Sequence, residues 1–185
     1  MNKQDLINKI RKLVKEQGCK LLEVHWIDLD KKQCIITAQP PKLTEPFKPT
    51  AYMVFPKYGV DLLAPSYGAY AYGFQEIKLE DAVLHELVIY GVASTDIVFI
   101  AILKNINTID WNYLTQEATR YGPTINNIIN ELRKLIVQGK EYDMKTLPIG
   151  LDTIAKAEEL YNVEVPEEIK KIVQEVENKW RALDQ

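Results

Sequence analysis

The chain has 185 residues, of which 46% are hydrophobic and 26% are charged, and its formal net charge is −3. This composition is typical of a globular protein with one well-developed core, and it excludes a chain that is disordered throughout. The slight negative charge excludes a uniformly basic nucleic-acid binder. Residues 1–20 nevertheless carry six Lys or Arg against two acidic residues, which leaves room for a local anion-binding face.

A helix followed by a hairpin is predicted at the start of the chain. Apolar residues recur at helical spacing between lysines over residues 3–17, and Gly18 is typical of a helix end. Residues 20–28 alternate between apolar and polar, which predicts a half-buried strand. Residues 33–38 follow a short charged turn and are predicted to form the second strand of the hairpin.

Prolines and short apolar runs mark the middle of the chain. Residues 39–49 hold four prolines and are predicted to form an extended loop. Strands are predicted for three short segments, namely residues 51–55, 60–64 and 69–79. Residues 80–92 show helical spacing. Residues 96–103 (DIVFIAIL) form an apolar run rich in Ile and Val, which is typical of a fully buried strand.

Helices are predicted for the rest of the chain. Their apolar residues recur at helical spacing, and they cover residues 108–121, 124–138, 152–161 and 166–184. The order of elements predicts an α+β or mixed α/β fold with a central mixed sheet flanked by helices. We expect a sheet-centred body over residues 1–105 and a C-terminal helical region over residues 106–185 that packs on the body as one unit.

The cysteine content and the hydropathy predict a cytoplasmic protein. Cys19 and Cys34 are too few for a disulfide scaffold, and together with His25 and His85 they show no spacing typical of a zinc site. The N-terminal residues do not resemble a signal peptide, and the most apolar region, residues 82–103, is interrupted by charged side chains. No glycine-rich nucleotide-binding motif occurs. We therefore expect no membrane span and no nucleotide cofactor.

Three charged residues stand within the predicted strands of the middle region: Asp61, Glu76 and Lys78. Residues two apart in a strand point to the same side, so Glu76 and Lys78 share a face. If the two strands pair, Asp61 lies within reach of Glu76. Two adjacent carboxylates repel each other, and a divalent cation such as Mg²⁺ or Mn²⁺ would hold both of them ionised. Such a cation can activate water and polarise a phosphate, while the lysine stabilises developing charge.

Asp61 in GVDLLA, together with Glu76 and Lys78 in FQEIK, resembles the signature of the PD-(D/E)xK nuclease superfamily. The resemblance covers about residues 3–103, and it implies the order helix, strands with the acid and the E-x-K, helix, strand. It implies a metal-dependent nuclease that cleaves phosphodiesters, with catalytic Asp61, Glu76 and Lys78 and nucleic acid as the partner. In that family a glutamate of the first helix often assists the metal, so Glu16 would join Asp61 and Glu76 as a ligand.

An alternative interpretation of the same region is a protein-binding surface. The three charged residues would then be the solvated face of a sheet. Five of the ten tyrosines lie between Tyr52 and Tyr72, and Tyr70, Tyr72 and Phe74 share one face if the strand is regular. A row of aromatic side chains can stack bases or contact a protein. This hypothesis describes a non-enzymatic α+β module, such as an adaptor, immunity or inhibitor protein, that binds its partner through the aromatic face.

Overall fold

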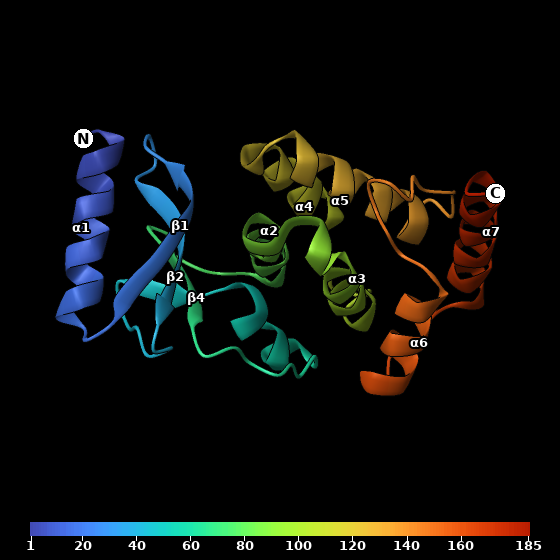
Figure 1. Ribbon diagram of the computed structural model, residues 1–185, viewed down its shortest axis with the longest axis horizontal. Helices are drawn as coiled ribbons and strands as arrows, with labels where there is room; N and C mark the ends of the chain where they lie inside the picture. The colour runs from blue at the N-terminus through green and yellow to red at the C-terminus, as the bar shows by residue number, and fades with distance from the viewer. The chain divides into compact units, whose positions relative to one another are not determined.

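The chain forms an α+β fold with 54% helix and one four-stranded sheet, as seen in the computed structural model of residues 1–185 (Figure 1). This fold class confirms the prediction. Residue contacts divide the chain into two compact units. The first unit consists of Met1–Lys57 and Asp61–Ile89, and the second consists of Tyr58–Val60 and Tyr90–Gln185. The division therefore falls before residues 96–103, which the sequence had placed in the sheet-centred body.

The first unit contains the sheet and two helices. In chain order its elements are α1 (Lys3–Glu16), β1 (Lys20–Asp28), β2 (Gln33–Gln39), β3 (Phe47–Pro49), β4 (Gly68–Tyr72) and α2 (Leu79–Tyr90). The predicted first helix, the hairpin and the helix near residues 80–92 are confirmed. The strand order is β1-β2-β4-β3 and each neighbouring pair is antiparallel. The sheet is therefore antiparallel rather than mixed, and β1 and β3 form its two edges.

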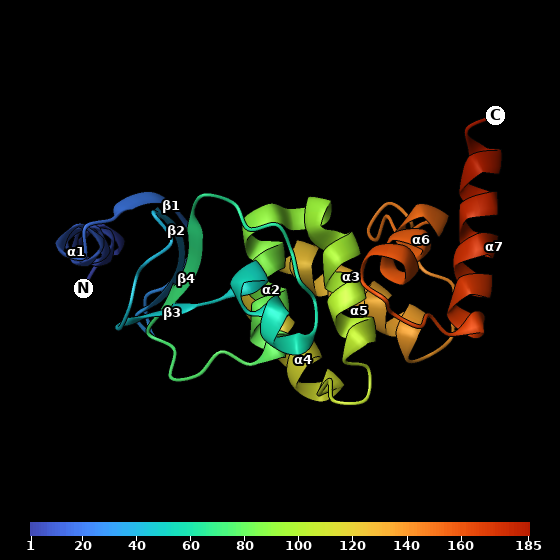
Figure 2. The same ribbon diagram turned by 90° about the horizontal axis from the view of Figure 1, so that it is seen from below.

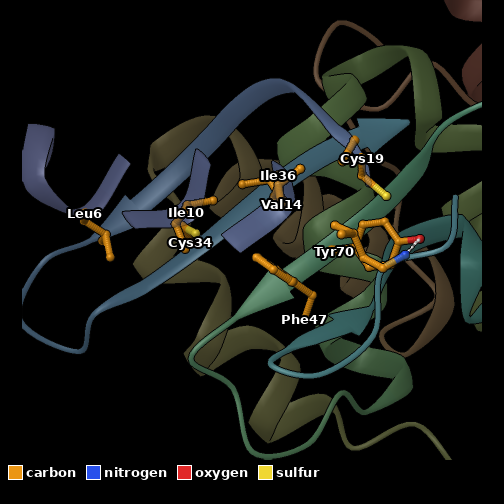
Figure 3. Packing of buried hydrophobic residues seen from close by; sticks show 10 residues of the cluster. Leu6, Ile10, Val14, Cys19, Cys34, Ile36, Phe47 and Tyr70 are labelled. Atoms are coloured by element: carbon orange, nitrogen blue, oxygen red, sulfur yellow. Dashed lines mark hydrogen bonds between the residues drawn. The ribbon is translucent and has the colours of Figure 1, made fainter. Parts of the chain in front are cut away.

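A core of apolar side chains lies between α1 and one face of the sheet. Leu6, Ile10 and Val14 are spaced by four residues, so they form one stripe along α1, and none is more than 1% exposed. The stripe packs against buried residues of the strands and loops, namely Cys19, Cys34, Ile36, Ala38, Leu43, Phe47 and Tyr70 (Figure 3). Figure 2 shows α1 nearly along its axis beside this face of the sheet. Removal of these apolar groups from water is the main force that holds α1 on the sheet.

Tyr70 joins the loop after β2 to this core. Its side chain is 1% exposed, and its hydroxyl oxygen accepts a hydrogen bond of 3.3 Å from the backbone N–H of Leu43 (Figure 3). The ring lies over Gly68, where an added Cβ would come within 2.5 Å of the ring. Burial raises the pKa of the Tyr70 hydroxyl, so this group stays protonated. The lack of a side chain at Gly68 therefore leaves the space that the ring of Tyr70 fills.

Residues 51–55 do not form the predicted strand, because α2 holds this segment in another conformation. Ala51–Met53 form a 3-10 helix, η1, and Ala51 has a φ of +53°, which no regular strand contains. Thr50 Oγ1 lies 2.6 Å from Nδ1 of His85, and the backbone N–H of Tyr52 donates to a carboxylate oxygen of Glu86 at 3.0 Å. These two bonds use polar side chains of α2 that are at most 3% exposed.

Two further strand predictions need correction. Residues 60–64 have no regular structure, and the predicted strand over residues 69–79 is confirmed only for Gly68–Tyr72. β4 ends there because Gly73 has a φ of +83°, and an added Cβ at Gly73 would come within 2.5 Å of the Lys32 carbonyl oxygen. The chain leaves the sheet at this glycine and runs as a loop to α2.

The predicted buried strand at residues 96–103 is wrong, since this segment is the helix α3 (Thr95–Lys104) of the second unit. Every residue from Ile97 to Leu103 is buried. A helix that is buried on all sides has no polar face and therefore no helical period in its sequence. Asn105, which follows α3, donates from its side-chain amide to the carbonyl oxygen of Tyr58 at 3.0 Å. This bond attaches the short segment Tyr58–Val60 to the second unit.

The remaining helices of the second unit confirm the prediction of a helical C-terminal region. They are α4 (Trp111–Ala118), α5 (Pro123–Ile136), α6 (Leu151–Leu160) and α7 (Glu167–Leu183). α5 and α7 each bury one apolar stripe, which includes Ile128 and Leu132 in α5 and Ile172 and Val176 in α7. Because each helix has a single buried stripe, its opposite face is polar and faces solvent.

One continuous helical stretch, Leu79–Lys104, is long and apolar enough to cross a membrane by length and composition. Its most apolar window has a mean hydropathy of 1.9, and 61% of this window is buried inside the protein. Such burial is typical of the core helix of a soluble protein.

The bond between Tyr70 and Leu43 gives a direct test of this core. Tyr70→Phe would leave the buried N–H of Leu43 without an acceptor, which costs about 1–2 kcal/mol of unfolding free energy. Tyr72→Phe is the matched control, because Tyr72 is only half-buried and packs through its ring. We expect urea unfolding to show that Tyr70→Phe lowers the unfolding free energy clearly, whereas Tyr72→Phe changes it by less than about 0.5 kcal/mol. Equal losses would contradict the placement of Tyr70.

Candidate functional site

The charged residues singled out by the sequence lie in exposed loops and not on strands. Asp61, Glu76 and Lys78 are all exposed, and none of them belongs to the sheet. Lys78 directly precedes α2, and its backbone N–H donates to a carboxylate oxygen of Asp81 at 2.9 Å. The expected alternation of Glu76 and Lys78 on one strand face is therefore wrong. Lys78 instead occupies the position that begins a helix.

The proposed metal ligands do not form a group with other ligand side chains. Glu16 lies near the end of α1, where one carboxylate oxygen is 4.0 Å from the Lys12 ammonium. No group of three or more His, Cys, Asp or Glu side chains in the chain could hold a metal ion. The last strand that the nuclease resemblance implies, residues 96–103, is the helix α3. The nuclease hypothesis, with Mg²⁺ or Mn²⁺ as its cofactor, stays a prediction that rests on the sequence pattern alone.

The aromatic residues of the second hypothesis point into the protein. Tyr70 is 1% exposed within the core under α1, so it cannot contact a partner. The Tyr72 ring packs against Phe47, with a centroid distance of 5.7 Å. Phe74 follows the end of β4, and its ring centroid lies 5.1 Å from that of His85. The predicted partner surface of Tyr70, Tyr72 and Phe74 is wrong as a flat exposed face, because the strand side that carries Tyr70 is the side covered by α1.

The open edge of β1 is the least protected part of the sheet. β1 pairs with β2 alone, so its other side presents backbone N–H and C=O groups that no strand satisfies. None of the nine residues of β1 is buried, whereas β2 is buried from Cys34 to Ala38. The other edge strand, β3, has only three residues and contains Pro49, which blunts it. β1 therefore offers the one long edge to which an added strand could pair.

A groove of about 410 Å³ runs between α1 and the C-terminal half of β1. Its lining combines apolar side chains with one lysine and one histidine, and it consists of Lys3, Ile7, Val24, His25, Trp26, Ile27 and Leu29. Leu29, in the turn after β1, is 42% exposed, and Leu22 on β1 is 41% exposed. Large apolar side chains at this exposure are typical of surfaces that bind another molecule when they border an apolar groove.

The sequence did not single out the residues of this groove, although two of its signals were present. The alternation over residues 20–28 predicted the half-buried strand, and the excess of cations in residues 1–20 left room for an anion-binding face. The strand order, which makes β1 an edge, depends on the pairing of β2 with the distant strand β4. No local pattern carries this information.

His25 occupies a bulge in the strand that lines the groove. Val24 pairs with Ile36 and Trp26 pairs with Ile35, so His25 has no directly opposite partner on β2. Its Nε2 lies 3.0 Å from Thr37 Oγ1, and its Nδ1 lies 3.8 Å from a carboxylate oxygen of Glu23. Burial lowers the pKa of the imidazole below its ordinary value of 6.5, and Glu23 opposes this shift in part. Neutral His25 is therefore the form that the fold favours.

Comparisons with protein-family models, with curated proteins and with solved structures find no match to this chain.

The lowered pKa of His25 predicts a pH dependence of stability. Because the folded pKa lies below the unfolded value of 6.5, the stabilising contribution of neutral His25 is complete above pH 6.5. It is lost as the pH falls below 6.5 through the folded pKa. His25→Gln removes this titration while His85 remains in both proteins. We expect the unfolding free energy of the wild type, relative to His25→Gln, to decrease between pH 7.5 and pH 5. A difference that is constant with pH would contradict the burial of this imidazole.

Proposed function

We propose that the chain is a non-enzymatic protein-binding module whose partner adds an extended segment to the open edge of β1. The observation that carries this proposal is the combination of a nine-residue edge strand, which pairs with β2 alone, and an adjacent apolar groove. An added strand obtains its affinity from main-chain hydrogen bonds and its specificity from pockets that take alternate side chains. The free edge of β1 would supply the hydrogen bonds, and the groove would take the side chains.

The two bulges of β1 limit where the added segment can pair. The pairing of β1 with β2 shifts between Leu21 and Glu23 and again between Val24 and Trp26. Bulges twist an edge and interrupt regular pairing. The groove is lined by β1 from Val24 to Ile27 and by Leu29 in the turn that follows β1. We therefore place the contact with the partner along this C-terminal half of β1. An adaptor, immunity or inhibitor protein would use such a contact to bind one specific partner.

We also propose that the protein is located in the cytoplasm. Cys19 and Cys34 are both free and buried, and burial raises the pKa of the Cys34 thiol to about 12. Thiols in this state resist oxidation and metal binding, and they act as small apolar core groups.

A selection from a displayed library of random twelve-residue peptides tests the proposal without knowledge of the natural partner. We expect the wild type to select binders, and Leu29→Lys to weaken them at least tenfold, because a charge replaces an apolar groove residue. Leu63→Lys is the matched control, since Leu63 is a fully exposed leucine of a loop in the same unit. Binders that survive Leu29→Lys, or a wild type that selects none, would contradict the proposal.

The metal-dependent nuclease is the alternative proposal, supported by the sequence pattern of Asp61, Glu76 and Lys78 and by the exposure of all three side chains. Nucleic acid would be its substrate. Cleavage of labelled DNA and RNA in Mg²⁺ or Mn²⁺, with Glu76→Ala as the variant and Glu45→Ala as an exposed control, decides between the two functions. Activity that Glu76→Ala abolishes and Glu45→Ala retains would favour the nuclease. We expect no cleavage by any of the three proteins.

A further inference from the structure

The edge strand β1, with the sequence KLLEVHWID, is complementary to a reversed copy of itself. Val24 is its central residue, so an antiparallel copy centred there brings together residues that are equally distant from Val24. Lys20 then lies opposite Asp28, which pairs opposite charges. Glu23 lies opposite His25, and these two side chains already approach each other within one chain, with His25 Nδ1 3.8 Å from a carboxylate oxygen of Glu23. No like charges meet in this pairing.

The core-facing side chains of β1 are symmetric about Val24 as well. Leu21, Val24 and Ile27 all pack against the core beneath α1, and they are spaced by three residues. In the pairing with a copy, Leu21 lies opposite Ile27 and Val24 lies opposite the second Val24. Opposite residues of an antiparallel pair share one face of the sheet. The apolar face of one copy's sheet would therefore continue into the apolar face of the other.

The two bulges of β1 also suit a copy of the same strand. The pairing of β1 with β2 shifts between Leu21 and Glu23 and again between Val24 and Trp26, so each half of β1 contains one extra residue. A regular strand that paired along the whole edge would lose its register at each bulge. An antiparallel copy places a half with one extra residue opposite another half with one extra residue. The copy can therefore pair along all of β1, and a regular segment cannot.

The same pairing brings apolar side chains to the groove beside the edge. Two antiparallel edge strands of identical chains are related by a two-fold axis perpendicular to the sheet, so α1 of both copies lies on the same face. Trp26 and Ile27 line the groove of one copy, and they would lie opposite Leu22 and Leu21 of the other. Leu22 is among the exposed large apolar side chains of the chain. Each copy would thus cover an apolar residue that the free edge leaves in water.

Resting on the proposed function, we infer that β1 of a second copy of this chain occupies the open edge when no other partner is bound. The two copies form a symmetric dimer through antiparallel β1 strands centred on Val24, and the two-fold axis repeats each charge pair. One strand edge makes a small interface, so we expect a dissociation constant of about 10–100 µM. The edge is therefore free at low concentration. At high concentration a partner has to displace the second copy, which regulates access to the site.

Analytical ultracentrifugation of the full chain at low salt, from about 1 µM to about 500 µM, tests the dimer through its charge pairs. Lys20→Glu and Asp28→Lys each place like charges opposite each other, and we expect each variant to dimerise at least fivefold more weakly than the wild type. An equimolar mixture of the two variants restores opposite charges in a heterodimer, so it should associate about as tightly as the wild type. Lys171→Glu, at an exposed lysine of α7, is the matched control and should leave the dimer unchanged. A mixture no tighter than the separate variants would overturn the inference.

A cysteine at the two-fold axis tests the register directly. The two copies of Val24 face each other with Cα atoms about 4.5–5.5 Å apart, which is within the range of a disulfide. The two copies of Leu22 lie about 13 Å apart along the strands, which is beyond that range. We expect diamide to cross-link Val24→Cys into a dimer and to leave Leu22→Cys monomeric, since the native Cys19 and Cys34 are buried in both. Equal cross-linking of the two variants, or none, would overturn the inference.

The outcomes separate this inference from the proposed function. If the chain stays monomeric up to the highest concentration while displayed peptides bind and depend on Leu29, the inference fails and the protein-binding function stands. If the chain dimerises in the Val24 register but selects no peptide, the edge serves self-association alone and the proposed function fails. Where both occur, a selected peptide should dissociate the dimer, because both use the edge of β1. A dimer that persists with the peptide bound would overturn the inference.

Discussion

The packing of the apolar stripe of α1 on one face of the sheet is the constraint on which the first unit depends. Leu6, Ile10 and Val14 can be buried only if a sheet face of matching apolar character lies beneath them, and β2, β3 and β4 supply it. Because α1 covers this face, Tyr70 is buried in the core. Gly68 must lack a side chain, since an added Cβ would collide with the ring of Tyr70. The same packing fixes which side of α1 faces outward at the β1 edge. It therefore determines both the core and the groove.

The same packing also explains which side chains line the groove. A helix laid along a sheet leaves its flanking residues beside the edge strand, and here these are Lys3 and Ile7. The edge strand is long and leaves Leu22 41% exposed, and Leu29 in the turn after it is 42% exposed. Natural proteins usually protect such an edge with prolines, short length, inward charges or bulges. The other edge, β3, is short and contains Pro49, whereas β1 has two bulges but is long and has no proline. The contrast between the two edges supports a binding role for β1.

The elements with a clear period were predictable from the sequence, and those without one were not. α1 and α7 each have one buried and one exposed side, so the helical period in their sequences indicates their structure directly. α3 is buried all round and lacks a period, and its Ile and Val content favoured the wrong element. Residues 51–55 depend on Thr50 and Tyr52 binding to His85 and Glu86, which are distant in the sequence. The candidate site depends on the order of the strands, which no local sequence pattern indicates.

Amide hydrogen exchange of the free protein at low concentration tests the central claim most directly, because it measures whether the edge of β1 is open. The account predicts that amides of Cys34–Ala38 in β2 exchange slowly, whereas those amides of Val24–Asp28 that do not pair with β2 exchange at least a hundredfold faster. It also predicts that a peptide selected from the displayed library slows the exchange of only this second group. Uniformly slow exchange along β1 in the free protein would show that the edge is already covered, and it would contradict the account.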